Sequence, residues 1–76
     1  MNVIKRDGTT EAFNASKIRN AILNAFNACG YETSVETIND IVDSIEIWND
    51  INIEDIQDQI EEILMDFDFP EVAKAF

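Results

Sequence analysis

The sequence has 76 residues, enough for one modest hydrophobic core, so we expect a single domain over residues 1–76. One cysteine and no histidine exclude an internal disulfide, a zinc cluster and the usual nucleophile–base pairs, so we expect neither a metal centre nor a catalytic site. No apolar run approaches the roughly 20 residues that a membrane-spanning helix requires, and we expect a cytoplasmic protein without membrane contact.

The charge of the chain is unevenly distributed. The formal net charge is −11, but residues 1–19 hold four cations and two acids, whereas residues 20–76 hold one cation and fourteen acids. Screening limits the reach of exposed charges to about 8 Å at physiological salt, so the early cations can attract a small anion. A nucleic acid would also meet the acidic remainder, and we therefore expect no nucleic-acid partner.

Residues 2–13 are predicted to form a β-hairpin. The dipeptide Asp7-Gly8 can supply the positive φ angles of a two-residue turn between short strands. With this turn, Lys5 lies opposite Thr10 across the ladder. The hairpin therefore carries its cations beside the tip.

The first helix is predicted over about residues 15–29. Asn14 is a natural N-cap, because its side chain can accept a hydrogen bond from a free N–H group of the first turn. Gly30 supplies a left-handed stop. The apolar residues between them recur at helical spacing: Ile18, Ile22, Ala25, Phe26 and Cys29.

A second helix is predicted over about residues 34–47. Thr33 and Glu36 have the spacing of a capping box at its start. Its apolar stripe consists of Val35, Ile38, Ile41, Val42, Ile45 and Trp48. We expect Trp48 to close the core.

A third helix is predicted over about residues 53–66, with Asn52 as its N-cap. Pro70 suits the first turn of a fourth helix over 70–76, and because the chain stops inside this helix we expect it to be a piece of a longer protein. The apolar face of the third helix consists of Ile53, Ile56, Ile60, Ile63, Leu64 and Phe67. These elements predict an α+β, mostly helical fold in which an N-terminal β-hairpin caps a small four-helix bundle.

The hairpin and the start of the first helix together favour an anion. The first N–H groups of a helix have no partner within it and attract negative charge. Lys5, Arg6 and Lys17 can neutralise several phosphate oxygens, with arginine offering a planar fork and lysine a point charge. A polyphosphate would suit this combination.

Polar and apolar residues nearby suit the rest of a nucleotide. Glu11 and Asn14 can hydrogen-bond a base or sugar, and Val3 and Ile18 can enclose a flat apolar ring. A structural explanation competes with this one, because lysine on a short exposed strand also prevents edge-to-edge aggregation. From composition alone we favour the structural explanation.

Three segments resemble the ATP-cone domain in the order of that family. Its opening signature is similar to residues 3–14 (VIKRDGTTEAFN), 17–19 (KIR) and 21–22 (AI). Its third helix is similar to residues 53–58 (IEDIQD) and its last helix to residues 71–76 (EVAKAF). The resemblance covers nearly the whole chain.

The resemblance implies a regulatory domain of a ribonucleotide reductase, in which ATP permits activity and dATP shuts it down. The hairpin would act as a lid, and Mg²⁺ would accompany the phosphates. The implied partners are the catalytic core of the reductase, which carries the catalysis, and further copies of the chain if the domain mediates oligomerisation.

The resemblance also implies which residues bind the nucleotide. The three cations named above would contact phosphates, and Glu11, Asn14 and Ile18 would lie near the adenine and sugar. The third helix adds Gln57 and Ile53, although an isoleucine replaces the hydroxyl residue often found there and cannot hydrogen-bond a phosphate. The aromatic and basic residues that follow in the family's last helix are missing, which implies weaker binding. With Val3, the candidate nucleotide-binding set is Val3, Lys5, Arg6, Glu11, Asn14, Lys17, Ile18, Ile53 and Gln57.

Two other interpretations remain. The acidic remainder is compatible with a helical protein–protein interaction module that has no small ligand. A calcium-binding loop is the weaker interpretation, because Asp55 replaces its central glycine and isoleucines continue a helical stripe through it. The oxygen ligands of that loop would be Asp50, Asn52, Glu54, Asp58 and Glu61.

Overall fold

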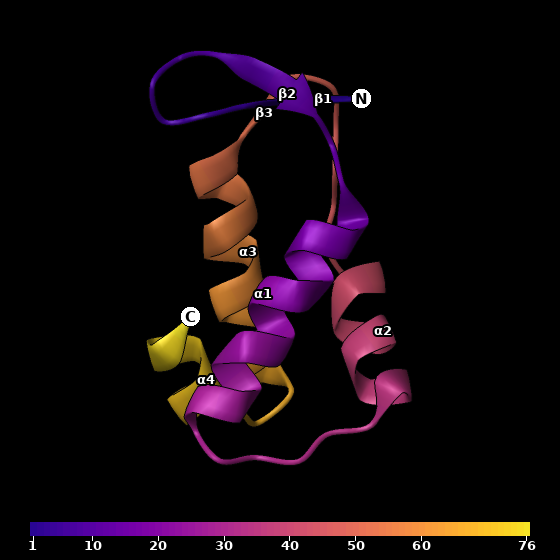
Figure 1. Ribbon diagram of the computed structural model, residues 1–76, viewed down its shortest axis with the longest axis vertical. Helices are drawn as coiled ribbons and strands as arrows, with labels where there is room; N and C mark the ends of the chain where they lie inside the picture. Colours follow the sequence, from indigo (N-terminus) through magenta and orange to yellow (C-terminus); the bar gives the residue numbers. More distant parts are fainter.

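The computed structural model describes residues 1–76 and contains three short strands and four helices (Figure 1). The elements are β1 (Asn2–Ile4), β2 (Thr10–Ala12), α1 (Ala15–Ala28), α2 (Val35–Asp43), β3 (Ile51–Asn52), α3 (Ile53–Asp66) and α4 (Pro70–Ala75). The sheet lies at one end of the molecule and the helices form the rest. The predicted α+β, mostly helical fold with four helices is confirmed. None of these helices combines the length and the apolar character that crossing a membrane requires.

The sheet has a third strand that the sequence did not predict. Its order is β2-β1-β3, and β1 runs parallel to β3 with Val3 opposite Ile51. Asn2 fastens this edge, because its N–H donates to Asn49 Oδ1 at 2.9 Å and its carbonyl accepts from the Asp50 N–H at 2.8 Å. A two-residue strand is too short to show alternation in the sequence. Since β3 leads directly into α3, this pairing fixes the start of α3 beside the hairpin.

The hairpin turn differs from the prediction by one residue. Lys5 donates its N–H to Thr9 O at 2.7 Å and Gly8 donates to Lys5 O at 3.0 Å, so three residues lie in the loop. Gly8 alone is left-handed there, with φ 85°, and the Asp7 carboxylate accepts from the N–H and hydroxyl of Thr9 at 3.0 and 2.6 Å. The predicted pairing of Lys5 with Thr10 is therefore wrong, because a single left-handed residue suits a three-residue loop with a bulge.

This shift decides which hairpin side chains face the helices. Val3 lies opposite Glu11, and Ile4 lies opposite Thr10. Cross-strand partners share a face of the sheet, and Val3 is only 3% exposed, so the face with Val3 and Glu11 is directed at the helices. The predicted register would have placed Glu11 on the other face.

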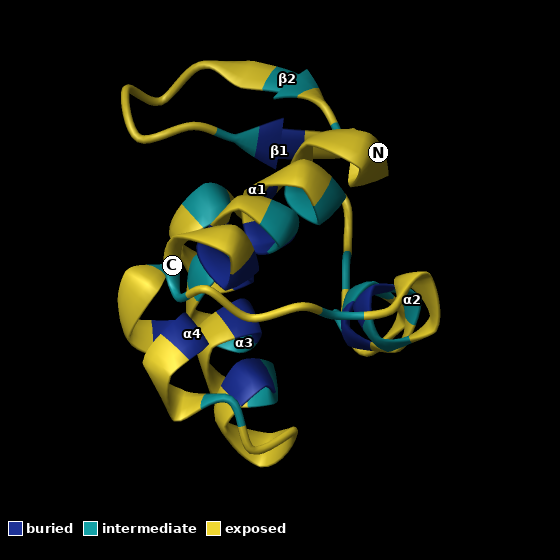
Figure 2. Cartoon of the chain, turned by 60° about the horizontal axis from the view of Figure 1, so that its bottom comes forward, coloured by how far each residue is buried: buried dark blue, intermediate teal, exposed yellow.

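The core consists of twelve buried residues, all of them apolar. In Figure 2 the buried segments of α1, α3 and α4 gather inside the helical layer, and exposed segments lie around them. Phe26 of α1 meets Phe69, which precedes α4, edge to face with ring centroids 4.9 Å apart. The members are Val3, Ile22, Ala25, Phe26, Ile38, Ile41, Ile51, Ile56, Ile60, Leu64, Val72 and Ala73.

The start of α2 differs from the predicted capping box. Ser34, not Thr33, is the N-cap, and its side chain accepts from the Thr37 N–H at 3.1 Å. This start leaves Val35 at the first helical position, where it is 76% exposed instead of buried in the stripe. At the start of α3, Asn52 has the predicted N-cap position but makes no side-chain cap bond.

The end of α2 also differs, because the helix stops at Asp43 and not near residue 47. The Ser44 hydroxyl donates to Asp40 O at 2.8 Å. Gln59 of α3 then binds both backbone groups of Glu46, at 2.8 Å each, which replaces the hydrogen bonds of a continuing helix. Trp48 lies in the following loop and is 48% exposed, so the prediction that it closes the core is wrong.

Candidate functional site

A cavity of about 180 Å³ lies between the hairpin, the first half of α1, the start of α3 and the end of the chain. We call it the hairpin cavity. Seven of the nine predicted site residues line it: Val3, Glu11, Asn14, Lys17, Ile18, Ile53 and Gln57. Residues distant in the sequence therefore meet at one place.

The floor of the hairpin cavity is apolar. Val3 comes from β1, and Ile56 and Ile60 come from the buried stripe of α3 and are fully buried. Ile18 and Ile53 are half-buried and extend this surface toward the opening. An apolar floor of this kind suits the face of a flat ring, because it removes the ring from water.

Polar groups stand at the edge of the floor. Lys17 Nζ lies 3.8 Å from Glu11 Oε2, so a cation and a carboxylate face each other across the junction of β2 and α1. The Asn14 Oδ1 atom accepts from the Ser16 N–H at 3.0 Å, which makes it the cap of α1. This bond uses the carbonyl oxygen of Asn14 and leaves its amino group as a donor.

The two remaining predicted residues, Lys5 and Arg6, line an adjoining hollow of about 350 Å³ together with Asp7. We call it the tip hollow. Glu11 and Ile53 line both the tip hollow and the hairpin cavity, so the two spaces adjoin. The combination is an apolar pocket that opens toward two cations.

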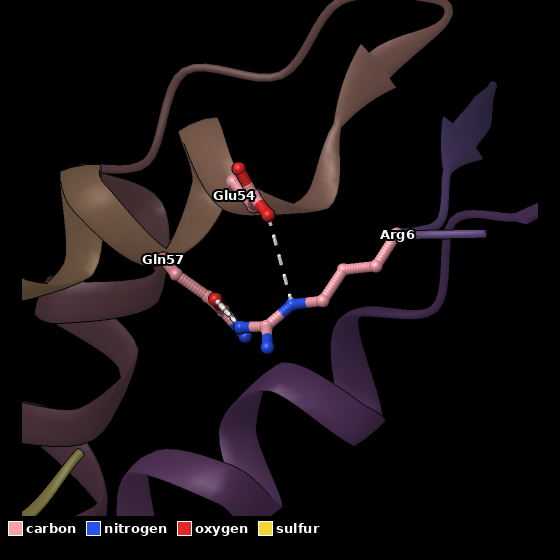
Figure 3. Close-up of polar contacts among 3 residues, drawn as sticks. All are labelled: Arg6, Glu54 and Gln57. Atoms are coloured by element: carbon pink, nitrogen blue, oxygen red, sulfur yellow. Dashed lines mark hydrogen bonds and ion pairs between the residues drawn. The ribbon is translucent and has the colours of Figure 1, made fainter. Parts of the chain in front are cut away.

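Arg6 connects the hairpin to α3 (Figure 3). Its Nη2 atom donates to Gln57 Oε1 at 2.7 Å, and its Nε atom lies 3.9 Å from Glu54 Oε1. Both partners are on the first two turns of α3. We call these three residues the Arg6 bridge.

A separate hollow of about 650 Å³ lies between α3 and the loop that follows α2. We call it the acidic hollow. Five carboxylates and Trp48 are among its lining residues, so its charge repels an anion. The carboxylates are Glu46, Asp55, Asp58, Glu62 and Asp66.

The sequence did not predict several residues of the hairpin cavity. Ile56 and Ile60 were placed in the core stripe, and the structure shows that the same stripe forms the cavity floor. Phe76, which the sequence placed only in the fourth helix, also lines the cavity. The sequence predicts Glu54 only as a calcium ligand, and that prediction is wrong because positions 54, 58 and 61 lie within α3.

A comparison with protein families identifies the chain. The family described as "ATP cone domain" matches residues 1–76, the whole chain. A search among curated proteins finds no match. The resemblance noted in the sequence is confirmed, and the chain belongs to the ATP-cone family, whose members are nucleotide-binding regulatory domains.

Proposed function

We propose that this domain binds ATP or dATP in the hairpin cavity and the tip hollow, and that it thereby controls the overall activity of a ribonucleotide reductase. The proposal depends on one observation: the apolar hairpin cavity lies next to three cations, Lys5 and Arg6 of the hairpin and Lys17 of α1. Ligand pockets usually have volumes of roughly 300–1,000 Å³. The tip hollow alone, at about 350 Å³, reaches that range.

The lining suggests an orientation for the nucleotide. The adenine and sugar would occupy the apolar hairpin cavity, where Glu11, Asn14 and Gln57 offer acceptors and donors. The phosphates would extend toward Lys5 and Arg6 in the tip hollow. Lys17, at the edge of the cavity, would be the third cation.

Magnesium fits this arrangement without a protein cage, because it keeps several waters and is held mainly by phosphate oxygens. Val3, Ile18 and Ile53 would contribute apolar contact and not hydrogen bonds. ATP and dATP differ only in a 2′-hydroxyl, so discrimination requires a polar group near the sugar that is paired with one ligand and unpaired with the other.

Regulation requires a partner. A ligand shifts a conformational equilibrium only through different affinities for its two states. In this proposal the two states are alternative packings of the domain against the catalytic core of a reductase, or against further copies of the chain, in the cytoplasm. The chemistry belongs to that core, because Cys29 is the only cysteine here and the chain contains no histidine to serve as its base.

One observation favours a second function. The acidic hollow combines five carboxylates with the exposed Trp48, a surface suited to a protein partner without any nucleotide. This alternative predicts that adenine nucleotides leave the stability of the domain unchanged.

Isothermal titration calorimetry of the chain with Mg-ATP, Mg-dATP and Mg-GTP tests the proposal. We expect binding of both adenine nucleotides and weaker binding of GTP. Lys17→Ala should weaken ATP binding by about 10- to 150-fold, because a charge-assisted contact is worth about 1.5–3 kcal/mol. Lys74→Ala is the matched control, since Lys74 lies on α4 and lines a different hollow with Met65 and Pro70.

Thermal unfolding gives an independent measurement. A ligand specific for the folded state stabilises it by about 2.7 kcal/mol at a hundredfold excess over its dissociation constant. Absence of both heat and a melting shift with ATP and dATP would reject the nucleotide site. Equal weakening by the Lys17 and Lys74 substitutions would show binding elsewhere on the surface.

A further inference from the structure

Arg6 is one of the cations that the proposed function assigns to a phosphate, and in the Arg6 bridge its guanidinium group already contacts Glu54 and Gln57. In the structure, Arg6 reaches from the hairpin to α3, donates to Gln57 Oε1 at 2.7 Å and places Nε 3.9 Å from Glu54 Oε1 (Figure 3). A carboxylate and a phosphate oxygen are the same kind of acceptor for a guanidinium group. Glu54 therefore attracts the Arg6 guanidinium with the same sign of charge as a phosphate, whereas the direct hydrogen bond of Arg6 goes to Gln57.

The contact is weak enough to be exchanged. The side chains of Arg6 and Glu54 are 67% and 70% exposed, so water screens their attraction. A polyphosphate carries several negative charges and competes well against a single exposed carboxylate. The ion pair can thus attract Arg6 and still release it to a phosphate.

Glu54 also has a fixed place beside the tip. Lys5, Arg6 and Glu54 line one small polar hollow of about 140 Å³ at the start of α3. Because β3 leads directly into α3 and pairs with β1, the sheet holds the Glu54 backbone next to the strand that leads to Arg6. The fold itself therefore places Glu54 where it can compete for Arg6.

From this geometry we propose that Glu54 sets the affinity of the site for a polyphosphate: its carboxylate attracts Arg6 toward α3, and the ligand must compete with this carboxylate for Arg6. This inference rests on the proposed function and adds a residue outside the predicted site. Glu54 is a competitor for Arg6 and not a ligand of the nucleotide.

Gln57 connects this exchange to the hairpin cavity. Its Oε1 atom accepts from Arg6, and its side chain also lines the cavity proposed for adenine and sugar. When Arg6 turns to a phosphate, the Gln57 carbonyl loses its donor and becomes free to accept from the base or sugar. Phosphate binding at the tip then gives the hairpin cavity an additional hydrogen-bond acceptor, Gln57 Oε1, for the base or sugar.

The test compares Glu54→Gln with the wild-type chain by calorimetry with Mg-ATP. The glutamine keeps the shape and an acceptor but removes the charge, so ATP should bind about two- to fivefold tighter, the range expected for an exposed ion pair. Glu61→Gln is the matched control: it makes the same change on α3, about 10 Å further along the axis, beside Met65 and Pro70. It should leave the affinity nearly unchanged.

A double substitution separates competition for Arg6 from simple repulsion of the phosphates. In an Arg6→Ala background, Glu54 has no arginine to hold, so Glu54→Gln should give no further gain. A full gain in that background would overturn the inference, as would unchanged or weaker ATP binding by Glu54→Gln alone. Failure of every variant and of the wild-type chain to bind ATP would instead reject the proposed function, so the two failures are distinguishable.

Discussion

The hairpin cavity and the acidic hollow lie on two sides of the same helix. Ile53, Ile56 and Gln57 of α3 line the cavity, whereas Asp55 and Asp58 of the same turns line the hollow. At 3.6 residues per turn, neighbouring positions point in different directions, so one helix presents an apolar wall to one space and carboxylates to the other.

This difference shows why the net charge of the chain misleads about its ligand. The value of −11 comes mainly from carboxylates on the helices, and four of them, from α3, gather around the acidic hollow together with Glu46 of the preceding loop. Three of the five cations, Lys5, Arg6 and Lys17, instead lie on the hairpin and at the start of α1. Since exposed charges act over about 8 Å at physiological salt, an anion at the tip experiences the local cations far more than the distant acids.

The largest expected effect is a loss of stability when a residue shared by the core and the floor of the hairpin cavity is truncated. Ile60 is fully buried and belongs to both, so Ile60→Ala should lower the free energy of unfolding by about 2–5 kcal/mol through lost burial and a new void. Urea denaturation measures it. Ile63→Ala is the control, because Ile63 is half-buried beside the acidic hollow and should cost less. Equal losses would contradict the placement of the core on the cavity side.

The sequence predicted the features of the fold that depend on local patterns. The stripe of α3, the cap at Asn14 and the proline at the start of α4 follow from local rules, and each was recognised. Local chemistry indicated seven of the nine candidate residues, and the resemblance added Ile53 and Gln57. Their assembly around two adjoining spaces became visible only when the fold brought β1, α1 and α3 together.

The missed features depend on contacts between distant residues. The early end of α2 depends on Gln59, thirteen residues beyond Glu46, and the third strand depends on pairing with Val3. Neither contact leaves a local pattern. Trp48 was misplaced for the same reason, because extending the stripe of α2 by one turn put an exposed loop residue into the core.

A smaller effect is expected from relieving charge in the acidic hollow. Asp58, Glu62 and Asp66 follow one another at four-residue spacing on α3, so like charges face each other along the helix. Glu62→Lys should turn two repulsive pairs into attractive ones and raise the free energy of unfolding by about 0.5–1 kcal/mol.

Thermal unfolding of this variant at low and high salt measures the gain, which should shrink as salt screens the pairs. The ATP affinity should stay the same, because the hollow does not adjoin the cations of the tip. A clear change in ATP affinity would mean that the two sides of α3 are coupled, and would weaken the contrast between them.

The smallest expected effect is a shift in the pKa of Asp7 in the hairpin turn, next to the cations Lys5 and Arg6. The Thr9 hydroxyl, and then the Thr9 N–H, hold the pKa of the Asp7 carboxyl below its ordinary value of 3.8 by hydrogen bonds to the charged form. A lowered pKa in the folded state means that the carboxylate stabilises the turn above pH 3.8 and that this contribution disappears as the pH falls through the folded value.

Nuclear magnetic resonance titration of the Asp7 carboxyl group checks this prediction. In the wild-type chain the midpoint should lie below 3.8, and in Thr9→Val it should rise, because the hydroxyl that contributes most is gone. Thr10→Val is the matched control, since Thr10 lies in β2 opposite Ile4 and makes no bond to Asp7. An unshifted Asp7 in the wild-type chain would mean that the turn is loose in solution. The three-residue loop would then not hold Lys5 and Arg6 at the mouth of the cavity, and the contrast with the acidic hollow would rest on α1 and α3 alone.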